Sequence, residues 1–382
     1  MKKNILSMLL ALALLCVCLA GCGAAPAAPA QEAPAAAAEP APVEEMAIPT
    51  SQTAPVTAMR DFTDDCGRTV TVPAEITRVA VSGPLAQVYV FPLCPELLVG
   101  FSTSFSEDAQ KYIPEEYLAL PELGQLYGGK GTMDLEALLA AAPQVVIDVG
   151  EAKGSIAEDL DGLTEQTGIP FVHIDATVAT AADAYTRLGE LTGKTEKAAQ
   201  LSAWCADTLA NMEAIMEGVD SVDARKTLVY CLGDKGLNVL AQGSYHAETV
   251  NMMGFNAAEL ADVVSSGMGN EVDMEQLILW DPEVIIFAPD SVYDDVLSDP
   301  TWQQLRAVST GQVYETPFGP YGWLASPPAV QRYLGMLWLA DILYPDYIDY
   351  DLQTEVTEYY KLFYGYDLSD EDYAVLTANA VR

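Results

Sequence analysis

Two histidines, His173 and His246, limit the chemistry that this chain can perform. Sites that hold zinc through three histidines are excluded. Any serine–histidine–aspartate triad would have to use one of these two histidines as its base. The motifs G-x-S-x-G and H-E-x-x-H are absent. A secreted hydrolase that uses a pair of carboxylates is the alternative function. The sequence does not single out such a pair, because it contains 55 Asp and Glu residues. The residues favour binding over catalysis, and they indicate no catalytic residue and no cofactor.

The side chains best suited to hold a ligand lie in loops with glycine or aromatic residues. Glycine permits close backbone approach, and flat aromatic faces suit a chelate or a macrocycle. Arg332 could hold an anionic group through a bidentate fork, and Tyr230, Tyr245 and His246 could coordinate iron or haem directly. The predicted ligand-binding residues are Gly83, Tyr127, Lys130, Tyr230, Tyr245, His246, Phe318, Tyr321, Trp323 and Arg332.

The charge balance excludes several partners. The 18 Lys and Arg residues stand against 55 Asp and Glu residues, which gives a net charge of −37. Such a chain repels phosphate backbones, so we expect no nucleic-acid partner. An anionic ligand would have to be held by local donors, because long-range attraction is lacking. This scarcity is what makes Lys130 and Arg332 informative.

The N-terminus has the pattern of a signal peptide over residues 1–21. Lys2 and Lys3 precede an apolar run, and Leu19-Ala-Gly-Cys22 resembles the bacterial lipobox. That resemblance implies cleavage before Cys22, lipid on this cysteine, and a chain held at the outer face of the cell membrane or in the periplasm. Removal of the two lysines leaves 16 basic against 55 acidic residues, a balance of −39. Residues 22–57 are rich in Ala and Pro and predict a disordered tether.

Beyond the tether, short β-branched runs alternate with helical patterns, which predicts an α/β fold. The composition divides this part into an N-terminal lobe over 58–193, a connecting helix over 194–218 and a C-terminal lobe over 219–382. Lys194–Glu217 holds no Gly or Pro and spaces its apolar residues by three or four, so we expect one rigid helix. Four cysteines of the lobes could form up to two disulfides, with the pairing open: Cys66, Cys94, Cys205 and Cys231.

An internal repeat indicates that the two lobes are similar. Residues 133–147 align without a gap with residues 272–286. Each copy predicts an N-cap Asp, an acidic first turn, a short helix, a Pro stop and a buried strand. The identical pairs are Asp134 and Asp273, Glu136 and Glu275, Leu138 and Leu277, Pro143 and Pro282, Val145 and Val284, and Ile147 and Ile286.

These motifs resemble the substrate-binding lipoproteins of ABC importers for iron complexes and vitamin B12, the class III periplasmic binding proteins. The resemblance rests on the opening at 65–81, the two repeat units, residues 254–258 and residues 302–314. It implies two α/β lobes joined by one long helix, a ligand cleft between them and little lobe movement. It also implies an acidic residue on each lobe that docks to the permease, and Glu136 and Glu275 match those positions.

The identity of the ligand stays open at this point. The resemblance implies a transported metal complex: a ferric siderophore, haem or cobalamin. A molybdate or tungstate oxyanion is the alternative, because residues 335–345 and 359–366 also resemble the oxyanion-associated branch. The expected partners are this ligand, the permease with its ATPase, and the membrane through the lipid. We expect the protein itself to be a monomer, and any metal ligands in it are unknown.

Overall fold

The computed structural model describes residues 58–127, 132–289 and 291–381. The chain separates into two units, Met1–Ala54 and Pro55–Arg382, and every described residue belongs to the second. The predicted signal peptide, the lipidation site at Cys22 and the tether lie outside the described residues.

A two-stranded hairpin begins the described part. β1 (Met59–Thr63) pairs antiparallel with β2 (Thr69–Pro73). In the turn between them, the carboxylate of Asp64 accepts hydrogen bonds from the backbone nitrogens of Cys66 and Arg68 and pairs with the Arg68 guanidinium at 2.6 Å. A buried carboxylate thus finds both charge and hydrogen-bond partners, which fixes the turn.

Three parallel strands form the sheet of the N-terminal lobe, in the order β3-β4-β5. Almost every residue of these strands is buried, as expected for a parallel sheet covered by helices on both faces. The strands are β3 (Val79–Val81), β4 (Val145–Gly150) and β5 (Phe171–Asp175). The helices of this lobe are α1 (Pro84–Leu93), η1 (Pro95–Leu97), α2 (Glu107–Gln110), α3 (Glu115–Leu118), α4 (Leu135–Ala141), α5 (Ile156–Thr167) and α6 (Ala181–Thr192).

A second, mixed sheet forms the C-terminal lobe, in the order β11-β10-β6-β7-β9, with β8 beside β6. β10 is parallel to β6 and β11, whereas β7 is antiparallel to both of its neighbours. The strands are β6 (Thr227–Leu232), β7 (Asn238–Val239), β8 (Phe255–Asn256), β9 (Asn270–Glu271), β10 (Val284–Phe287) and β11 (Val313–Glu315). The helices are η2 (Tyr245–Ala247), α8 (Glu248–Met253), α9 (Met274–Trp280), α10 (Tyr293–Val296), η3 (Trp302–Gln304), α11 (Arg306–Ser309), α12 (Arg332–Leu343), α13 (Leu352–Tyr364) and α14 (Asp370–Leu376).

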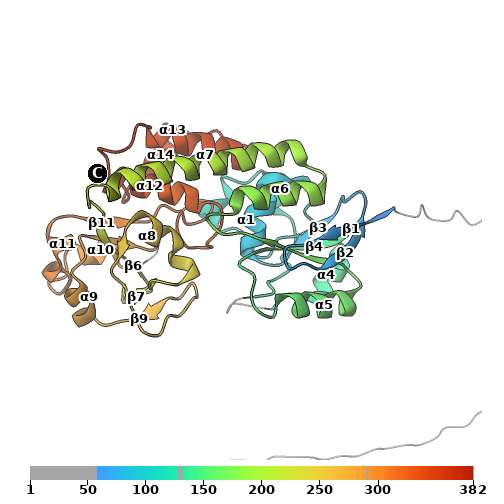
Figure 1. Ribbon diagram of the computed structural model, residues 1–382, viewed down its shortest axis with the longest axis horizontal. Helices are drawn as coiled ribbons and strands as arrows, with labels where there is room; N and C mark the ends of the chain where they lie inside the picture. The colour runs from blue at the N-terminus through green and yellow to red at the C-terminus, as the bar shows by residue number, and fades with distance from the viewer. Residues whose placement is uncertain (1–57, 128–131, 290, 382) are drawn as a thin grey trace, which may run out of the picture. The chain divides into compact units, whose positions relative to one another are not determined.

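The long helix between the sheets is α7 (Thr195–Asp220), which has 26 residues. It packs against α6 of the N-terminal lobe and against α12 of the C-terminal lobe, as Figure 1 shows. Its buried side chains include Leu201, Met212 and Ile215, which lie on the face that the apolar spacing predicted. Two α/β lobes joined by a long helix are therefore confirmed, while the exact lobe boundaries remain a prediction.

The parallel strands β4 and β10 present alternate residues to two different cores. In β4, Val145 and Ile147 belong to the large core that also contains α7, α12 and α13, whereas Val146 belongs to a smaller core with Leu138 of α4. In β10, Ile286 faces the large core and Ile285 faces a core with α9. The helical layer is thus shared by the two lobes, and each lobe has a core of its own on the other face.

The repeat folds in the same way in both lobes. Asp134 caps α4 by accepting from the backbone nitrogen of Ala137, and Asp273 caps α9 by accepting from that of Gln276. Both helices end at a residue with positive φ, Ala142 at 45° and Asp281 at 38°. The repeat therefore reproduces the backbone at both ends of the helix, and it places β4 and β10 in separate sheets.

The disulfides considered from the sequence do not form in this structure, because Cys66, Cys94, Cys205 and Cys231 are all free. They lie in a turn, at the end of α1, in α7 and in β6. Burial raises the pKa of Cys94 to about 12 and raises the pKa of Cys205 and Cys231 as well. These three thiols therefore behave as small apolar core residues.

Candidate functional site

The candidate site lies where the two lobes meet near the carboxyl ends of strands β4 and β5. Ligands of α/β proteins bind beyond these strand ends, because the loops there surround the sheet edge. β4 ends at Gly150 and β5 at Asp175, and the chain that follows β5 contacts the C-terminal lobe. Three of the predicted residues, Tyr245, His246 and Arg332, come together at this junction.

Arg332 is the centre of this group. It is the first residue of α12, and only 2% of it is exposed. Its guanidinium pairs with the carboxylate of Glu248, donates to the carbonyl oxygen of Pro328, and lies 4.4 Å from the ring centroid of Tyr245. Both terminal nitrogens of the guanidinium are thus engaged within the protein. A fixed positive charge results, held by an ion pair and an aromatic face.

Tyr245 and Glu248 join the two lobes. The Tyr245 hydroxyl donates to the carbonyl oxygen of Ala176 at 2.7 Å, and the Glu248 carboxylate accepts from the backbone nitrogen of Val178 at 3.2 Å. Ala176 and Val178 directly follow β5. Burial raises the pKa of Tyr245, so its hydroxyl stays protonated and remains a donor. The Arg332 group therefore touches the strand-end loop of the other lobe.

His246 supplies a neutral imidazole at the same place. Burial, together with the charges of Arg332 and Lys153, lowers its pKa to about 4. Its Nδ1 atom is buried and has no hydrogen-bond partner among the described residues. A buried polar atom without a partner costs free energy, which a ligand would recover. Depending on its tautomer, Nδ1 can donate to an oxygen or bind a metal.

The N-terminal lobe contributes Lys153, whose charge helps to lower the pKa of His246 and which lies over the ring of Tyr127. The Nζ atom of Lys153 lies 4.3 Å from the ring centroid of Tyr127, whose hydroxyl donates to Asp159 at 2.7 Å. Burial and then this carboxylate raise the pKa of Tyr127, while the same bond lowers the pKa of Asp159. Lys153 is exposed and makes no ion pair among the described residues. Its ammonium is available to an anionic ligand.

A polar network joins β4, β5 and the residue after β3 in the same lobe. His173 is fully buried, and its Nδ1 lies 2.7 Å from the carboxylate of Asp148, which also accepts from the hydroxyl of Ser82. The aspartate lies between the other two residues, so the serine contacts no histidine and the arrangement is not that of a Ser-His-Asp triad. Gly83 follows Ser82 and is the N-cap of α1. The network fixes the loop in which Gly83 lies.

A separate cavity of about 520 Å³ is lined by both lobes. Its walls come from the region of α2, from the loops after β10 and β11, and from the end of α14. Phe318 lines it, with 41% of the residue exposed. Phe318 therefore lies at the carboxyl ends of the C-terminal strands, as predicted, but with a different set of residues from Arg332.

Other predicted residues are buried in the protein. Tyr230 in β6 is 1% exposed and Trp323 is fully buried, and both belong to the large core. Tyr321 is partly buried, and its hydroxyl accepts from Gln87 of α1 at 2.9 Å. Tyr321 therefore links the two lobes, and its hydroxyl is already engaged by a residue of the protein. Lys130 lies outside the described residues.

Two residues of the junction, Lys153 and Glu248, were missed from the sequence. Lys153 lies in the loop between β4 and α5, and the scarcity of basic residues was the signal that could have found it. Glu248 left no signal, because one acidic residue among 55 carries no information.

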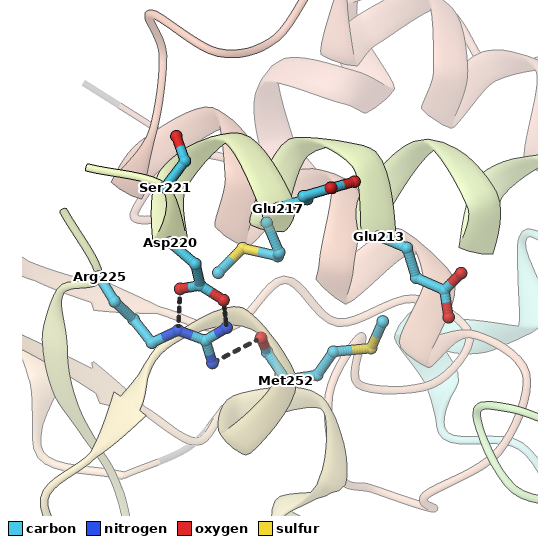
Figure 2. A pocket seen from close by; sticks show the side chains of 7 residues that line it. Glu213, Glu217, Asp220, Ser221, Arg225 and Met252 are labelled. Atoms are coloured by element: carbon cyan, nitrogen blue, oxygen red, sulfur yellow. Dashed lines mark hydrogen bonds and ion pairs between the residues drawn. The ribbon is translucent and has the colours of Figure 1, made fainter. Parts of the chain in front are cut away.

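Figure 2 shows a hollow at the C-terminal end of α7, lined by Glu213, Glu217 and Met252 among others. Arg225 pairs there with Asp220 at 2.8 Å. This hollow lies beside the residues that precede β6, at the amino end of that strand. Its position is therefore opposite to that expected for a ligand site.

Glu136 and Glu275 are both exposed, in the first turns of α4 and α9. Neither forms an ion pair within the described residues. Over residues 58–127, 132–289 and 291–381, no three His, Cys, Asp or Glu side chains are grouped to hold a metal ion. In the same residues, no helix has both the length and the apolar content needed to cross a membrane.

Comparison with known proteins finds similarity to binding proteins in each case. A family model described as periplasmic binding protein matches residues 97–320. The Fe(3+)-citrate-binding protein YfmC of Bacillus subtilis is 22% identical over 191 residues, which are 49% of this chain and 58% of that protein. The chain thus matches less than two thirds of that relative's length.

Two solved structures are similar in fold. An ABC transporter solute binding protein from Sulfurospirillum deleyianum is 28% identical, with a TM-score of 0.74, and the match covers 84% of this chain and 99% of that one. The molybdate periplasmic binding protein MolA of Haemophilus influenzae, bound to molybdate, is 21% identical, with a TM-score of 0.65 and coverage of 81% and 99%.

Proposed function

Because the chain belongs to the periplasmic binding protein family, a family of binding proteins and not of enzymes, we propose that it is the substrate-binding component of an ABC importer. In this role it captures a small ligand outside the cytoplasm and delivers it to a membrane permease. Lipid on Cys22 would hold it at the membrane. A Cys22→Ser variant should then move from the membrane fraction to the soluble fraction.

The ligand we propose is a compact anionic metal complex of the ferric citrate type. The observation that carries this choice is the group at the lobe junction: the buried positive charge of Arg332, held by Glu248, the unpartnered Nδ1 of His246, and the exposed ammonium of Lys153. These donors suit carboxylate oxygens around a metal, and the curated relative is named for ferric citrate. The metal enters with its own ligands, so the protein need only recognise the complex.

Molybdate is the second candidate, because His246 and Lys153 as donors, next to the positive charge of Arg332, also suit a tetrahedral oxyanion. A relative of the same fold was solved with molybdate. Haem and cobalamin, considered from the sequence, are less favoured, since Tyr230 and Trp323 are buried in the core and do not offer their faces to a ligand.

Thermal unfolding with ferric citrate, molybdate, tungstate, haem and cobalamin would identify the ligand class. A ligand at 100 times its Kd should add about 2.7 kcal/mol to the free energy of unfolding. Lys153→Ala should weaken binding of the best ligand, while Lys361→Ala, which removes a lysine from the exposed pair with Asp367 on α13, should not. If Lys153→Ala binds as tightly as the unchanged protein, the junction is not the ligand site.

We further propose that Glu136 and Glu275 dock to basic side chains of the permease, one in each half. The variant Glu136→Lys/Glu275→Lys should abolish stimulation of the permease ATPase. It should leave ligand affinity intact, because both residues lie on exposed helices outside the junction. Unchanged stimulation would contradict this docking proposal.

A further inference from the structure

The two repeat units agree in burial as well as in sequence. Residues 132–148 and 271–287 fall into the same class, exposed, intermediate or buried, at every one of their aligned positions. Conserved capping and stop residues explain the backbone, but they do not require the exposed faces to agree. The similarity of the two units therefore extends to their solvent-exposed residues, which the capping and stop residues do not determine.

On that face each glutamate has an aliphatic neighbour. Leu139 lies three residues after Glu136, and Ile278 lies three residues after Glu275, so each pair shares one side of its helix. Leu139 is 50% exposed and Ile278 is 39% exposed. Single exposed aliphatic residues are ordinary on protein surfaces. Two of them at equivalent repeat positions, each beside an unpaired carboxylate, are not explained by chance exposure alone.

Resting on the docking proposal above, we infer that each lobe contacts the permease through a pair of side chains, Glu136 with Leu139 and Glu275 with Ile278. The partner surface carries two equivalent basic sites, each with an apolar rim that covers the aliphatic side chain. Charge complementarity supports a basic partner surface, because the protein is strongly acidic and these two carboxylates find no cation within the described residues. Covering the aliphatic groups removes apolar surface from water and also desolvates the ion pairs.

The chain provides a matched control in α9. Leu279 is 78% exposed, more than Ile278, and it is adjacent on the same helix. Its counterpart in α4 is Ala140, so an aliphatic side chain at this position is not repeated. If only the repeated positions contact the permease, Leu279 does not contact it, although Leu279 is more exposed than Ile278.

The test is binding of the ligand-free protein to the permease–ATPase complex in nanodiscs, measured by surface plasmon resonance. Leu139→Ala/Ile278→Ala should raise the Kd for the permease roughly tenfold or more, and Leu279→Ala should leave it within about twofold. Thermal midpoints should match those of the unchanged protein, since the altered side chains are half exposed.

The outcomes separate the two proposals. If Glu136→Lys/Glu275→Lys abolishes binding while Leu139→Ala/Ile278→Ala binds normally, the inference is overturned and the docking glutamates stand. If Leu279→Ala weakens binding as much as the double variant, the repeated pair is not the determinant and the inference also fails. If neither the glutamate nor the aliphatic variant changes binding, both proposals are wrong.

Discussion

The guanidinium of Arg332 lies 4.4 Å from the ring centroid of Tyr245, whose hydroxyl in turn donates to Ala176 of the other lobe. One aromatic side chain thus supports the buried positive charge on its face and connects the lobes at its tip. Because both contacts are made by Tyr245, a substitution that disturbs one of them should also change the other.

Tyr245→Phe should lower the free energy of unfolding by about 1 to 2 kcal/mol, because the carbonyl oxygen of buried Ala176 loses its donor while the ring under Arg332 is kept. Urea unfolding measures this. Tyr347→Phe is the control, since Tyr347 is 39% exposed and its hydroxyl makes no hydrogen bond within the described residues. Equal stability of the two variants would show that the bond contributes nothing.

Glu248→Gln should cost about 1 to 3 kcal/mol of stability, because it leaves the buried guanidinium of Arg332 without a counter-charge. The effect is below that of a fully buried pair, since the Glu248 side chain is 30% exposed. Asp367→Asn breaks an exposed pair with Lys361 and should change stability by only about 0 to 1 kcal/mol. Chemical denaturation of both variants at neutral pH gives the comparison, and similar costs would argue against the buried pair.

The pKa of His246, lowered to about 4, makes a prediction for pH. Between its ordinary value near 6.5 and about 4, the unfolded chain takes up a proton that the folded protein does not. Stability should therefore fall as pH drops through this window, and the histidine should add no such dependence above it. His246→Gln should show a shallower loss of stability over the same window in urea titrations. An unchanged slope would mean that His246 is not held neutral.

Two glycines in helices should respond to Ala in opposite directions. A Cβ on Gly189 of α6 would lie 2.4 Å from the Cβ of Ala198 in α7, so Gly189→Ala should cost about 1 to 3 kcal/mol by forcing these helices apart. A Cβ on Gly162 of α5 meets nothing within 4 Å. Gly162→Ala should therefore stabilise the protein by roughly 0.5 to 1 kcal/mol. Thermal and urea unfolding of both variants test the tight contact at the start of α7.

Local rules were enough to predict much of the fold. The repeat unit was predicted with its caps and its following strand, because an N-cap Asp, a Pro stop and a β-branched run act over a few residues. The long helix was predicted for the same reason, although α7 continues through Gly218 to Asp220. Short strands leave a weaker local signal: β7 has only two residues, and its place between β6 and β9 is set by tertiary pairing.

The site was predicted only in part. Tyr245, His246 and Arg332 were named from the sequence because their residue types are rare in it or suited to ligands. Their mutual contacts, and the ion pair that engages Arg332, depend on residues 84 to 87 positions apart in the chain. Sequence could not separate Phe318, which lines a cavity, from Trp323, which is in the core.

The sequence by itself therefore determined the elements, their repetition and the family, because these follow from local capping, periodicity and order along the chain. Tertiary structure decided which polar groups meet: it brought the charge of Lys153 near enough to lower the pKa of His246, gave Arg332 its counter-ion and left the four cysteines unpaired with one another. The physical reason is that charge pairing and burial depend on distances across the lobe junction, and packing, not sequence spacing, sets those distances.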